Sequence, residues 1–149
     1  MRVLVQRSLA SSVTVEGTCI GAINKGIVAL IGFTEGDTIE DIEYCIHKLI
    51  NLRIFEDKNG VMNESILDQK GSVLSISQFT LYASTEKGNR PSYSRALPAS
   101  DAEPLYELWN QKLSQYIQVE KGQFGADMKV TITNDGPVTI LIESRKKHD

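Results

Sequence analysis

Residues 128–142 read MKVTITNDGPVTILI, in which a turn signal, Asn134 to Thr139, separates two apolar alternating runs. Asp-Gly tolerates the backbone angles of a tight turn. The proline that follows removes one backbone donor and restricts the residue before it. We therefore predict a β-hairpin whose tip, Gly136-Pro137, is rigid and presents bare carbonyls. A plain turn is the simpler interpretation of an isolated Gly-Pro pair.

The segments before this stretch predict more β-structure. Ile27 to Gly32 is apolar throughout, as in a strand buried on both faces. Short alternating segments, typical of antiparallel strands, occupy the rest of the first third: Val3 and Val5, Val13 and Val15, and Cys19 to Ile23. A longer strand is predicted from Val73 to Leu81, and a long loop from about Ala83 to Pro98.

Two helices are predicted from apolar residues at helical spacing. The first runs from about Thr38 to Leu52, with Asp37 and Glu40 as a capping-box-like pair. The second begins near a Ser100 and Glu103 capping box, and its apolar face comprises Leu105, Leu108, Trp109, Leu113 and Tyr116. Many short strands with two helices indicate an α+β fold, residues 1–149 forming a single domain. We expect an antiparallel curled sheet or β-barrel with two packed helices.

Composition excludes several classes of protein. The net charge of −3 argues against a protein that coats nucleic acid with its whole surface, although Lys87, Arg90 and Arg95 share one loop and residues 145–148 are basic. The longest apolar run, Ile27 to Phe33, is far shorter than the roughly 20 residues that cross a bilayer. With no signal-peptide pattern and only two cysteines, the chain is expected to be cytoplasmic, off the membrane and without a disulfide.

The strand predicted from Val73 to Leu81 carries polar residues where a sheet interior is usually apolar. By strict alternation Gln78 and Thr80 share one face while Ser77 and Phe79 share the other, so Ser77 and Thr80 converge only if the strand bends. A bend would also free backbone N–H groups, which then suit an oxyanion. The alternative is a half-buried strand whose hydroxyls are simply hydrogen-bonded.

Familiar catalytic arrangements are missing from the sequence. The histidines are His47 and His148, and a Cys45-His47 pair points to different sides of a helix. Metal-ligand and phosphate-loop motifs are absent, so we expect no metal and no cofactor. Such a chain is suited to an already activated bond, broken by positioning and backbone electrostatics. An aminoacyl ester on RNA is a bond of this kind.

Taken together, the motifs resemble the D-aminoacyl-tRNA deacylase family, formerly called D-tyrosyl-tRNA(Tyr) deacylase. The resemblance runs from end to end of the chain. It is carried by Val5-Gln6-Arg7, residues 51–55, Ser77-Gln78-Phe79-Thr80-Leu81, Arg90-Pro91-Ser92, Phe124-Gly125-Ala126-Asp127-Met128 and Asn134-Asp135-Gly136-Pro137-Val138-Thr139.

The resemblance implies a homodimer that removes D-amino acids, and also glycine, from tRNA without a cofactor. Gly136 and Pro137, joined by a cis bond, are then expected to enter the partner's active site and to exclude an L side chain. Residues matching the facing motif, which the family uses for the terminal adenosine and the aminoacyl carbonyl, are Ser77, Gln78, Phe79 and Thr80. Arg7 is expected to brace the Gly-Pro loop, and Met128 to contribute to substrate binding.

Several alternatives stay open at the level of the sequence. Either Thr80 is the nucleophile, or the RNA's own 2′-hydroxyl assists hydrolysis and backbone N–H groups stabilise the reaction. The lack of a base next to Thr80 favours the second alternative. A trans Gly136-Pro137 bond would indicate the sister activity on L-alanyl-tRNA. A non-enzymatic nucleic-acid-binding barrel and an esterase for free amino-acid esters are further possibilities. Glu86 and Asn89 stand where many relatives carry basic residues, which weakens the expected RNA contacts.

Overall fold

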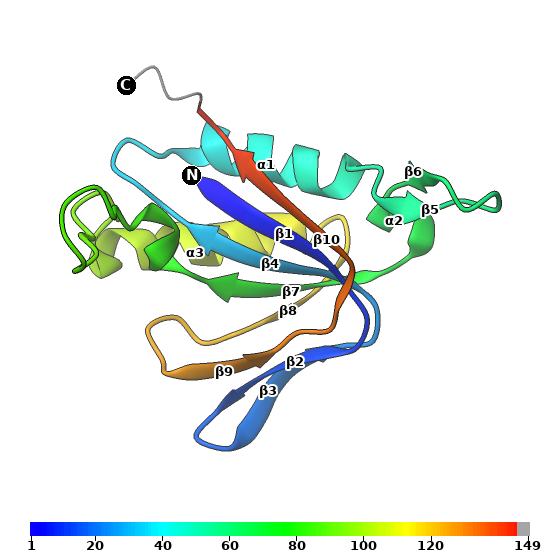
Figure 1. Ribbon diagram of the computed structural model, residues 1–149, viewed down its shortest axis with the longest axis horizontal. Coiled ribbons are helices and arrows are strands. Elements are labelled where there is room, and N and C mark those ends of the chain that lie inside the picture. The colour runs from blue at the N-terminus through cyan, green and yellow to red at the C-terminus, as the bar shows by residue number, and fades with distance from the viewer. Residues whose placement is uncertain (146–149) are drawn as a thin grey trace.

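A five-stranded mixed sheet, in the order β10-β1-β4-β7-β8, forms the centre of the computed structural model, which describes residues 1–145 (Figure 1). Strands β10 and β4 pair antiparallel with β1, whereas β7 is parallel to β4 and β8 is parallel to β7. The bounds are β1 (Arg2–Ser8), β4 (Gly26–Gly32), β7 (Ser72–Ser77), β8 (Gln118–Lys121) and β10 (Asn134–Glu143).

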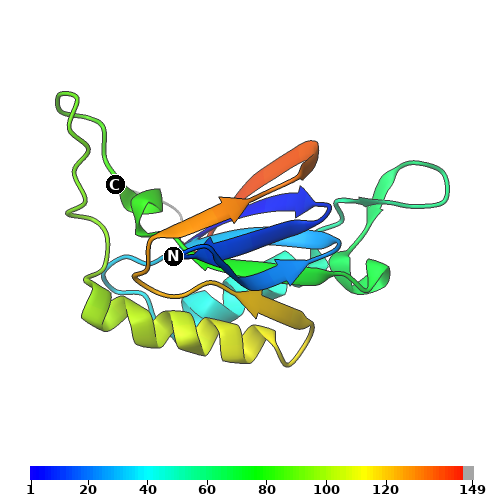
Figure 2. The same cartoon turned by 90° about the horizontal axis from the view of Figure 1, so that it is seen from below.

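A second layer lies on each face of this sheet. Helices α1 (Ile39–Asn51) and α3 (Ala99–Leu113) cover one face, and a three-stranded sheet covers the other (Figures 1 and 2). That sheet has the order β3-β2-β9 and consists of β2 (Ser11–Val15), β3 (Thr18–Ile23) and β9 (Met128–Thr131). The remaining short elements come after α1 in the sequence: β5 (Phe55–Glu56), β6 (Met62–Glu64), α2 (Ile66–Gln69) and the 3₁₀ helix η1 (Phe79–Tyr82).

The predicted α+β class is confirmed, and of the two sheet forms considered, the curled open sheet is the one observed. The sheets do not close into a barrel, and parallel pairs accompany the antiparallel ones. A short third helix, α2, escaped the sequence because four residues carry no periodic signal.

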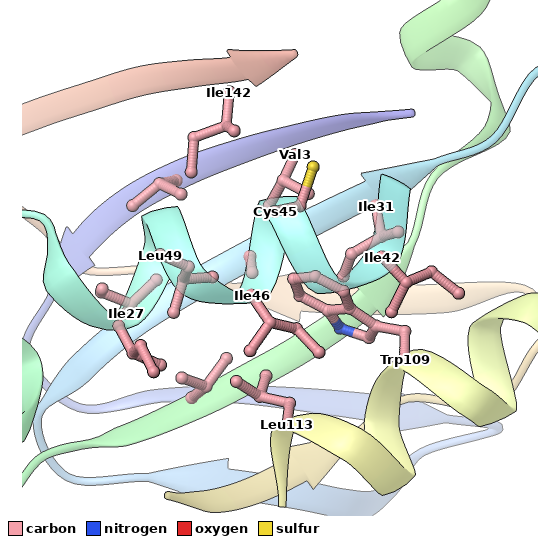
Figure 3. Close-up of a cluster of buried hydrophobic side chains, with 14 of the residues drawn as sticks. Val3, Ile27, Ile31, Ile42, Cys45, Ile46, Leu49, Trp109, Leu113 and Ile142 are labelled. Carbon is pink, nitrogen blue, oxygen red and sulfur yellow. The ribbon is translucent and has the colours of Figure 1, made fainter. Parts of the chain in front are cut away.

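Two hydrophobic clusters hold the layers together. Strand β4 is buried on both faces, as predicted: Ile27 and Ile31 pack toward the helices, while Val28 packs toward the second sheet. Trp109 of α3 is fully buried and packs among aliphatic side chains from α1 and the central sheet (Figure 3). Truncating a side chain of this size typically destabilises a domain by about 3–5 kcal/mol.

Both helices occur close to where predicted, but α3 ends at Leu113, so Tyr116 lies beyond it and is exposed, and the caps of both helices differ from the prediction. Helix α1 begins after Thr38, which forms a capping box with Asp41, so the proposed Asp37 and Glu40 pair was wrong by one residue. Asp37 instead accepts a hydrogen bond from the Met1 ammonium at 2.8 Å. Helix α3 begins after Pro98 with no side-chain cap, so the Ser100 and Glu103 box was also wrong.

The predicted hairpin at residues 128–142 does not form, although both strands exist. Strand β9 pairs with β2 and strand β10 pairs with β1, so the chain crosses from one sheet to the other between them. Residues 134–137 lie inside β10, beyond the crossing. Alternation of apolar residues specifies strands but not their partners, and here both partners are distant in the sequence.

The helices of the described chain lack the combination of length and apolar character that a bilayer-spanning helix needs. Most of the basic C-terminal run considered above, including His148, lies outside the described residues.

Candidate active site

The predicted strand from Val73 to Leu81 ends early, at Ser77, and this produces the bend that the motif required. Ser77 pairs with Ile31, and the next residue, Gln78, still donates its N–H to the Ile31 carbonyl at 2.7 Å. The chain then turns into η1. Within residues 1–145, the backbone N–H groups of Phe79 and Thr80 donate no hydrogen bond. Two unpaired donors therefore lie side by side directly after the strand.

A pocket of about 360 Å³ opens beside these donors. Ser77 and Phe79 line it from the bend, Tyr93 and Leu97 from the long loop, and Phe124 from the segment after β8. Phe79 and Tyr93 contact each other edge to face, with ring centroids 5.2 Å apart, and each ring is about half exposed. Aromatic side chains around a concave apolar site are what proteins use to hold an unstacked nucleobase.

The side chain of Thr80 has an amide as its neighbour rather than a base. Its hydroxyl accepts a hydrogen bond from Gln78 Nε2. Because an amide N–H donates and cannot take up a proton, this contact does not activate Thr80 as a nucleophile. Ser77 lies on the same face of β7 as Ser75, toward α3 and the pocket.

The other groups considered for catalysis lie apart from this pocket. Cys45 is fully buried in the core beneath α1, and burial raises the pKa of its thiol to about 12. His47 lies on the exposed side of α1, where Nδ1 is 3.4 Å from the Asn51 amide nitrogen. Within the described part of the chain, no three His, Cys, Asp or Glu side chains gather as a metal site would require.

Gly136 and Pro137 form a bulge in β10, and the peptide bond between them is cis. Thr139 pairs with Gln6 and Asn134 pairs with Ser8, so residues 135–138 lie opposite Arg7 alone. Both Gly136 and Pro137 are exposed. The expectation of bare carbonyls needs a correction, because the Pro137 carbonyl accepts a hydrogen bond from the Thr139 hydroxyl at 3.3 Å.

Asn134, which the sequence pattern did not single out as a site residue, closes the base of this bulge. Its Nδ2 donates to the carbonyls of Arg7 and Val138, both at 3.0 Å. Its Oδ1 accepts from Gln6 Nε2 and from the Thr139 hydroxyl, also at 3.0 Å. Asparagine commonly bonds to nearby backbone in turns, and that preference could have drawn attention to it.

Arg7 holds the bulge from the other side. Its Nη1 donates to the Ile54 carbonyl at 2.7 Å and its Nε donates to the Asp135 carbonyl at 3.2 Å. The arginine is 7% exposed, so these contacts are largely shielded from water. Gly136 has φ +116°, and a Cβ there would lie 2.8 Å from the Val138 nitrogen and 3.1 Å from Arg7 Nη2. Only glycine fits this position without strain.

The two motifs lie at opposite ends of the sheet within one chain. Ser77 pairs with Ile31 of β4, which pairs with Val3 of β1, whereas Gly136 lies opposite Arg7 of β1. They are separated by about 13 Å along the strands and about 14 Å across them, at the usual spacings of a sheet. Figure 1 shows this directly, since β7 ends on the side opposite the start of β10.

Met128 lies at the pocket end, but in a different layer. It packs against the cluster between the two sheets, and its sulfur is 2.5 Å from the place where a Cβ of Gly122 would lie. From this part of the chain, the residues that line the pocket are Phe124 and Gly125, which precede Met128.

An α+β fold with an apolar, base-sized pocket beside unpaired backbone donors is suited to a hydrolase that acts on an activated ester attached to a nucleotide. Comparison with known proteins agrees with this class. The family model described as D-Tyr-tRNA(Tyr) deacylase matches residues 4–143. The chain belongs to this deacylase family, and it is therefore a hydrolase of the ester bond in D-aminoacyl-tRNA.

Individual relatives match along the whole chain. The D-aminoacyl-tRNA deacylase of Bacteroides fragilis strain YCH46 is 53% identical, with 99% of each chain covered. The solved structure of a protein called "c-Myc DNA Unwinding Element Binding Protein" is 41% identical, with a TM-score of 0.93 over 98% of this chain and 100% of the other. A probable eukaryotic D-amino acid tRNA deacylase, 16% identical with a TM-score of 0.82, covers 95% of this chain and 98% of its own, and shows the fold alone.

Proposed function

We propose that this deacylase proofreads chirality: it releases D-amino acids and glycine from tRNA and leaves L-aminoacyl-tRNA intact. The observation that supports the proposal is the split between a pocket with unpaired N–H donors at one end of the sheet and the rigid Gly136-Pro137 bulge at the other. The expected compartment is the cytoplasm, where tRNAs are charged.

In this proposal the pocket holds the terminal adenosine of the tRNA. Its aromatic walls at Phe79 and Tyr93 suit a nucleobase, and Ser77 lies where the ribose and the ester would follow. The N–H groups of Phe79 and Thr80 then face the aminoacyl carbonyl, where negative charge develops as the ester is attacked.

The chemistry needs few protein groups. A water oxygen bonds to the carbonyl carbon, and the N–H groups of Phe79 and Thr80 stabilise the oxyanion. The bond from that carbon to the ribose 3′-oxygen breaks, and the leaving oxygen takes a proton relayed through the neighbouring 2′-hydroxyl. The products are a free amino acid and tRNA. Gln78 donates to Thr80 and leaves its hydroxyl without a base, so Thr80 acts as a support and not as a nucleophile.

The working unit is proposed to be a two-fold dimer in which Gly136 and Pro137 of one protomer reach the pocket of the other. A single chain keeps the two motifs apart, and an isologous dimer brings each bulge to the partner's pocket, which makes two composite sites. Carbonyls of the bulge then meet the α-ammonium of the substrate, and the bulge occupies the space an L side chain would need. Arg7 and Asn134 hold the bulge in shape for this task.

The direct test uses D-Tyr-tRNA and L-Tyr-tRNA side by side, with release of labelled amino acid as the measurement. The expected result is rapid loss of the D ester and persistence of the L ester. Glycyl-tRNA should also be hydrolysed, and a free D-tyrosine ester should react far more slowly, because it lacks the adenosine that fills the pocket. Equal rates for D-Tyr-tRNA and L-Tyr-tRNA would show that the proofreading proposal is wrong.

A second candidate function is DNA binding, because the 41% identical relative of known structure is called a DNA unwinding element binding protein. The net charge of −3 makes extensive phosphate contact unfavourable here. Binding of a duplex at physiological salt, unaffected by mutation of the pocket, would support this second function.

A further inference from the structure

Arg2, at the start of β1, contacts the segment behind the candidate active site, and the proposed reaction does not use it. Its Nε donates to Glu143 Oε1 at 2.8 Å, and its Nη1 donates to the Leu81 carbonyl at 2.7 Å. Its guanidinium carbon lies 4.6 Å from the centroid of the Tyr82 ring. Two of these three contacts fall on η1, directly after Thr80.

The ring of Tyr82 links two walls of the pocket. Tyr82 is 4% exposed, and the guanidinium of Arg95 lies 5.9 Å from the centroid of the same ring. Arg95 belongs to the loop that carries Tyr93, and the Arg95 carbonyl accepts a hydrogen bond from the Thr34 hydroxyl at 2.5 Å. Attraction between a guanidinium and an aromatic face is stronger when both are shielded from water. Both η1 and the loop therefore meet at one buried ring.

Close packing against β4 leaves η1 little room to move toward the sheet. Arg2 pairs with Gly32 in the sheet register. A Cβ at Gly32 would lie 2.9 Å from the Gln78 carbonyl oxygen and 3.1 Å from Leu81 Cβ. Gly32 therefore leaves the space that η1 occupies, and Arg2, its partner in the sheet register, donates the hydrogen bond that holds the end of η1.

We propose that Arg2 is a positioning residue for deacylation, which with Tyr82 holds η1 so that the Phe79 and Thr80 N–H groups stay directed at the reacting carbonyl. The inference rests on the proposed role of those N–H groups. Arginine is required because its planar fork reaches Glu143 and Leu81 at the same time, whereas a lysine ammonium is a single compact charge.

The test compares Arg2→Lys and Tyr82→Leu with two controls. Tyr82→Phe keeps the ring under the guanidinium. Arg145→Lys makes the same chemical change at the same end of the sheet, but Arg145 bonds to the Asp37 carboxylate and the Glu35 carbonyl and makes no hydrogen bond to η1. The measurements are kcat and KM on D-Tyr-tRNA, the melting temperature, and hydrogen exchange of the Leu81 and Ala83 amides, which donate to the Gln78 and Thr80 carbonyls and so report whether η1 stays formed.

Arg2→Lys and Tyr82→Leu should each lower kcat about tenfold, because small misplacement of reacting groups is costly. KM should change less than about twofold, as for a group that acts mainly in the transition state. Exchange of the two amides should become faster in both variants. Tyr82→Phe should retain kcat, and Arg145→Lys should lower only the melting temperature.

The proposal is overturned if Arg2→Lys lowers the melting temperature while kcat and amide exchange match those of Arg145→Lys, because Arg2 then serves stability alone. Should Arg2→Lys fail to fold, the Tyr82 pair decides: equal kcat for the Leu and Phe variants contradicts the proposal. If the unmodified protein does not deacylate D-Tyr-tRNA, the proposed function fails, and the exchange measurements still test whether Arg2 and Tyr82 hold η1.

Discussion

The two ends of the central sheet differ. Unpaired backbone donors border an apolar pocket where β7 stops, whereas hydrogen bonds from Arg7 and Asn134 hold an exposed bulge where β10 begins. The first end has room for a ligand and donors without partners. The second has acceptors and little freedom, because side-chain hydrogen bonds reach it from β1 and from the base of the bulge itself.

This difference shows how a site with few reactive side chains is organised. Donors suit the oxyanion of an ester under attack, and acceptors suit the ammonium of an amino acid. In the proposed reaction each end is complementary to a different part of one substrate, and a second protomer brings the two together. The contrast between the two ends leads to four predictions, ordered from the largest expected effect to the smallest.

The largest effect is expected from damage to both ends in separate chains. Gly136→Val introduces a side chain with no space and an unfavourable φ, and Ser77→Ala alters the pocket wall. Each variant alone should lose at least about 10²-fold in kcat, as expected when a reacting group is misplaced. After subunit exchange, about half of the dimers should be mixed, each with one intact composite site. The mixture should regain about a quarter of the activity of the unmodified protein.

Deacylation should be measured before and after exchange, with exchange itself confirmed by differently tagged chains. Doubly altered chains, carrying Gly136→Val and Ser77→Ala together, are the control: a dimer of one such chain with an unmodified chain has both composite sites damaged, so mixing these chains should lower activity and restore none. Confirmed exchange without recovered activity would mean that the cross-subunit site is wrong.

The next effect concerns the bulge alone. Arg7→Met keeps the apolar stem of the side chain but leaves the buried Ile54 carbonyl without its donor. Removing one partner of a buried hydrogen bond should lower the free energy of unfolding by about 2 kcal/mol. Urea unfolding measures the change, and Arg53→Met, at an exposed arginine bonded to Asn63, is the matched control with a smaller loss. If Arg7→Met and Arg53→Met lower the free energy of unfolding equally, the hydrogen bonds of Arg7 contribute no more than those of an exposed arginine, and the prediction is wrong.

A smaller effect is expected from Thr80→Ala at the pocket end. Because the hydroxyl faces an amide and not a base, kcat should fall less than about 10²-fold, the loss that typically follows removal of one oxyanion donor. Thr80→Ser, which keeps the hydroxyl, should stay near the unmodified rate. If Thr80→Ala abolishes deacylation while folding and dimerisation remain intact, Thr80 is the nucleophile.

The smallest effect is the dependence of tRNA binding on salt. A protein with a net charge of −3 and few exposed basic clusters, such as Lys87 and Arg90, neutralises only a handful of phosphates. The slope of log affinity against log salt should therefore be shallow, and Lys87→Gln should reduce it by about 1 or less. Titration of tRNA at several salt concentrations measures the slope. A value implying about eight or more contacts would contradict the prediction.

Local features of the fold followed from the residues themselves. The doubly buried strand Ile27 to Gly32 and the α1 helix were predicted from apolar spacing, because burial imposes a period on any sequence that forms them. The caps were less predictable, since several polar residues compete for each helix end and the surrounding chain selects one. Thr38 was selected over Asp37 because the Asp37 carboxylate is occupied by the Met1 ammonium and Arg145.

Candidate site residues were found from the sequence through unusual composition: polar residues in an apolar strand, and Gly-Pro inside an alternating run. The arrangement of these residues in space could not be predicted in the same way. That β7 stops at Ser77 depends on β4, which ends at Gly32 and leaves room for η1. Arg2 was missed because its contact with Leu81 joins residues 79 positions apart, which no local pattern records. Asn134 was missed as a site residue although two of its hydrogen bonds are local, to Val138 and Thr139.

The sequence by itself determined which residues alternate and which lack an adjacent catalytic base, since these properties depend on neighbours along the chain. Tertiary structure alone decided that β9 and β10 belong to different sheets, that Gly136-Pro137 is a bulge rather than a hairpin tip, and that it lies far from Ser77. The physical reason is that strand partners are chosen by hydrogen bonds and packing between distant segments, and alternation is satisfied equally well by more than one partner.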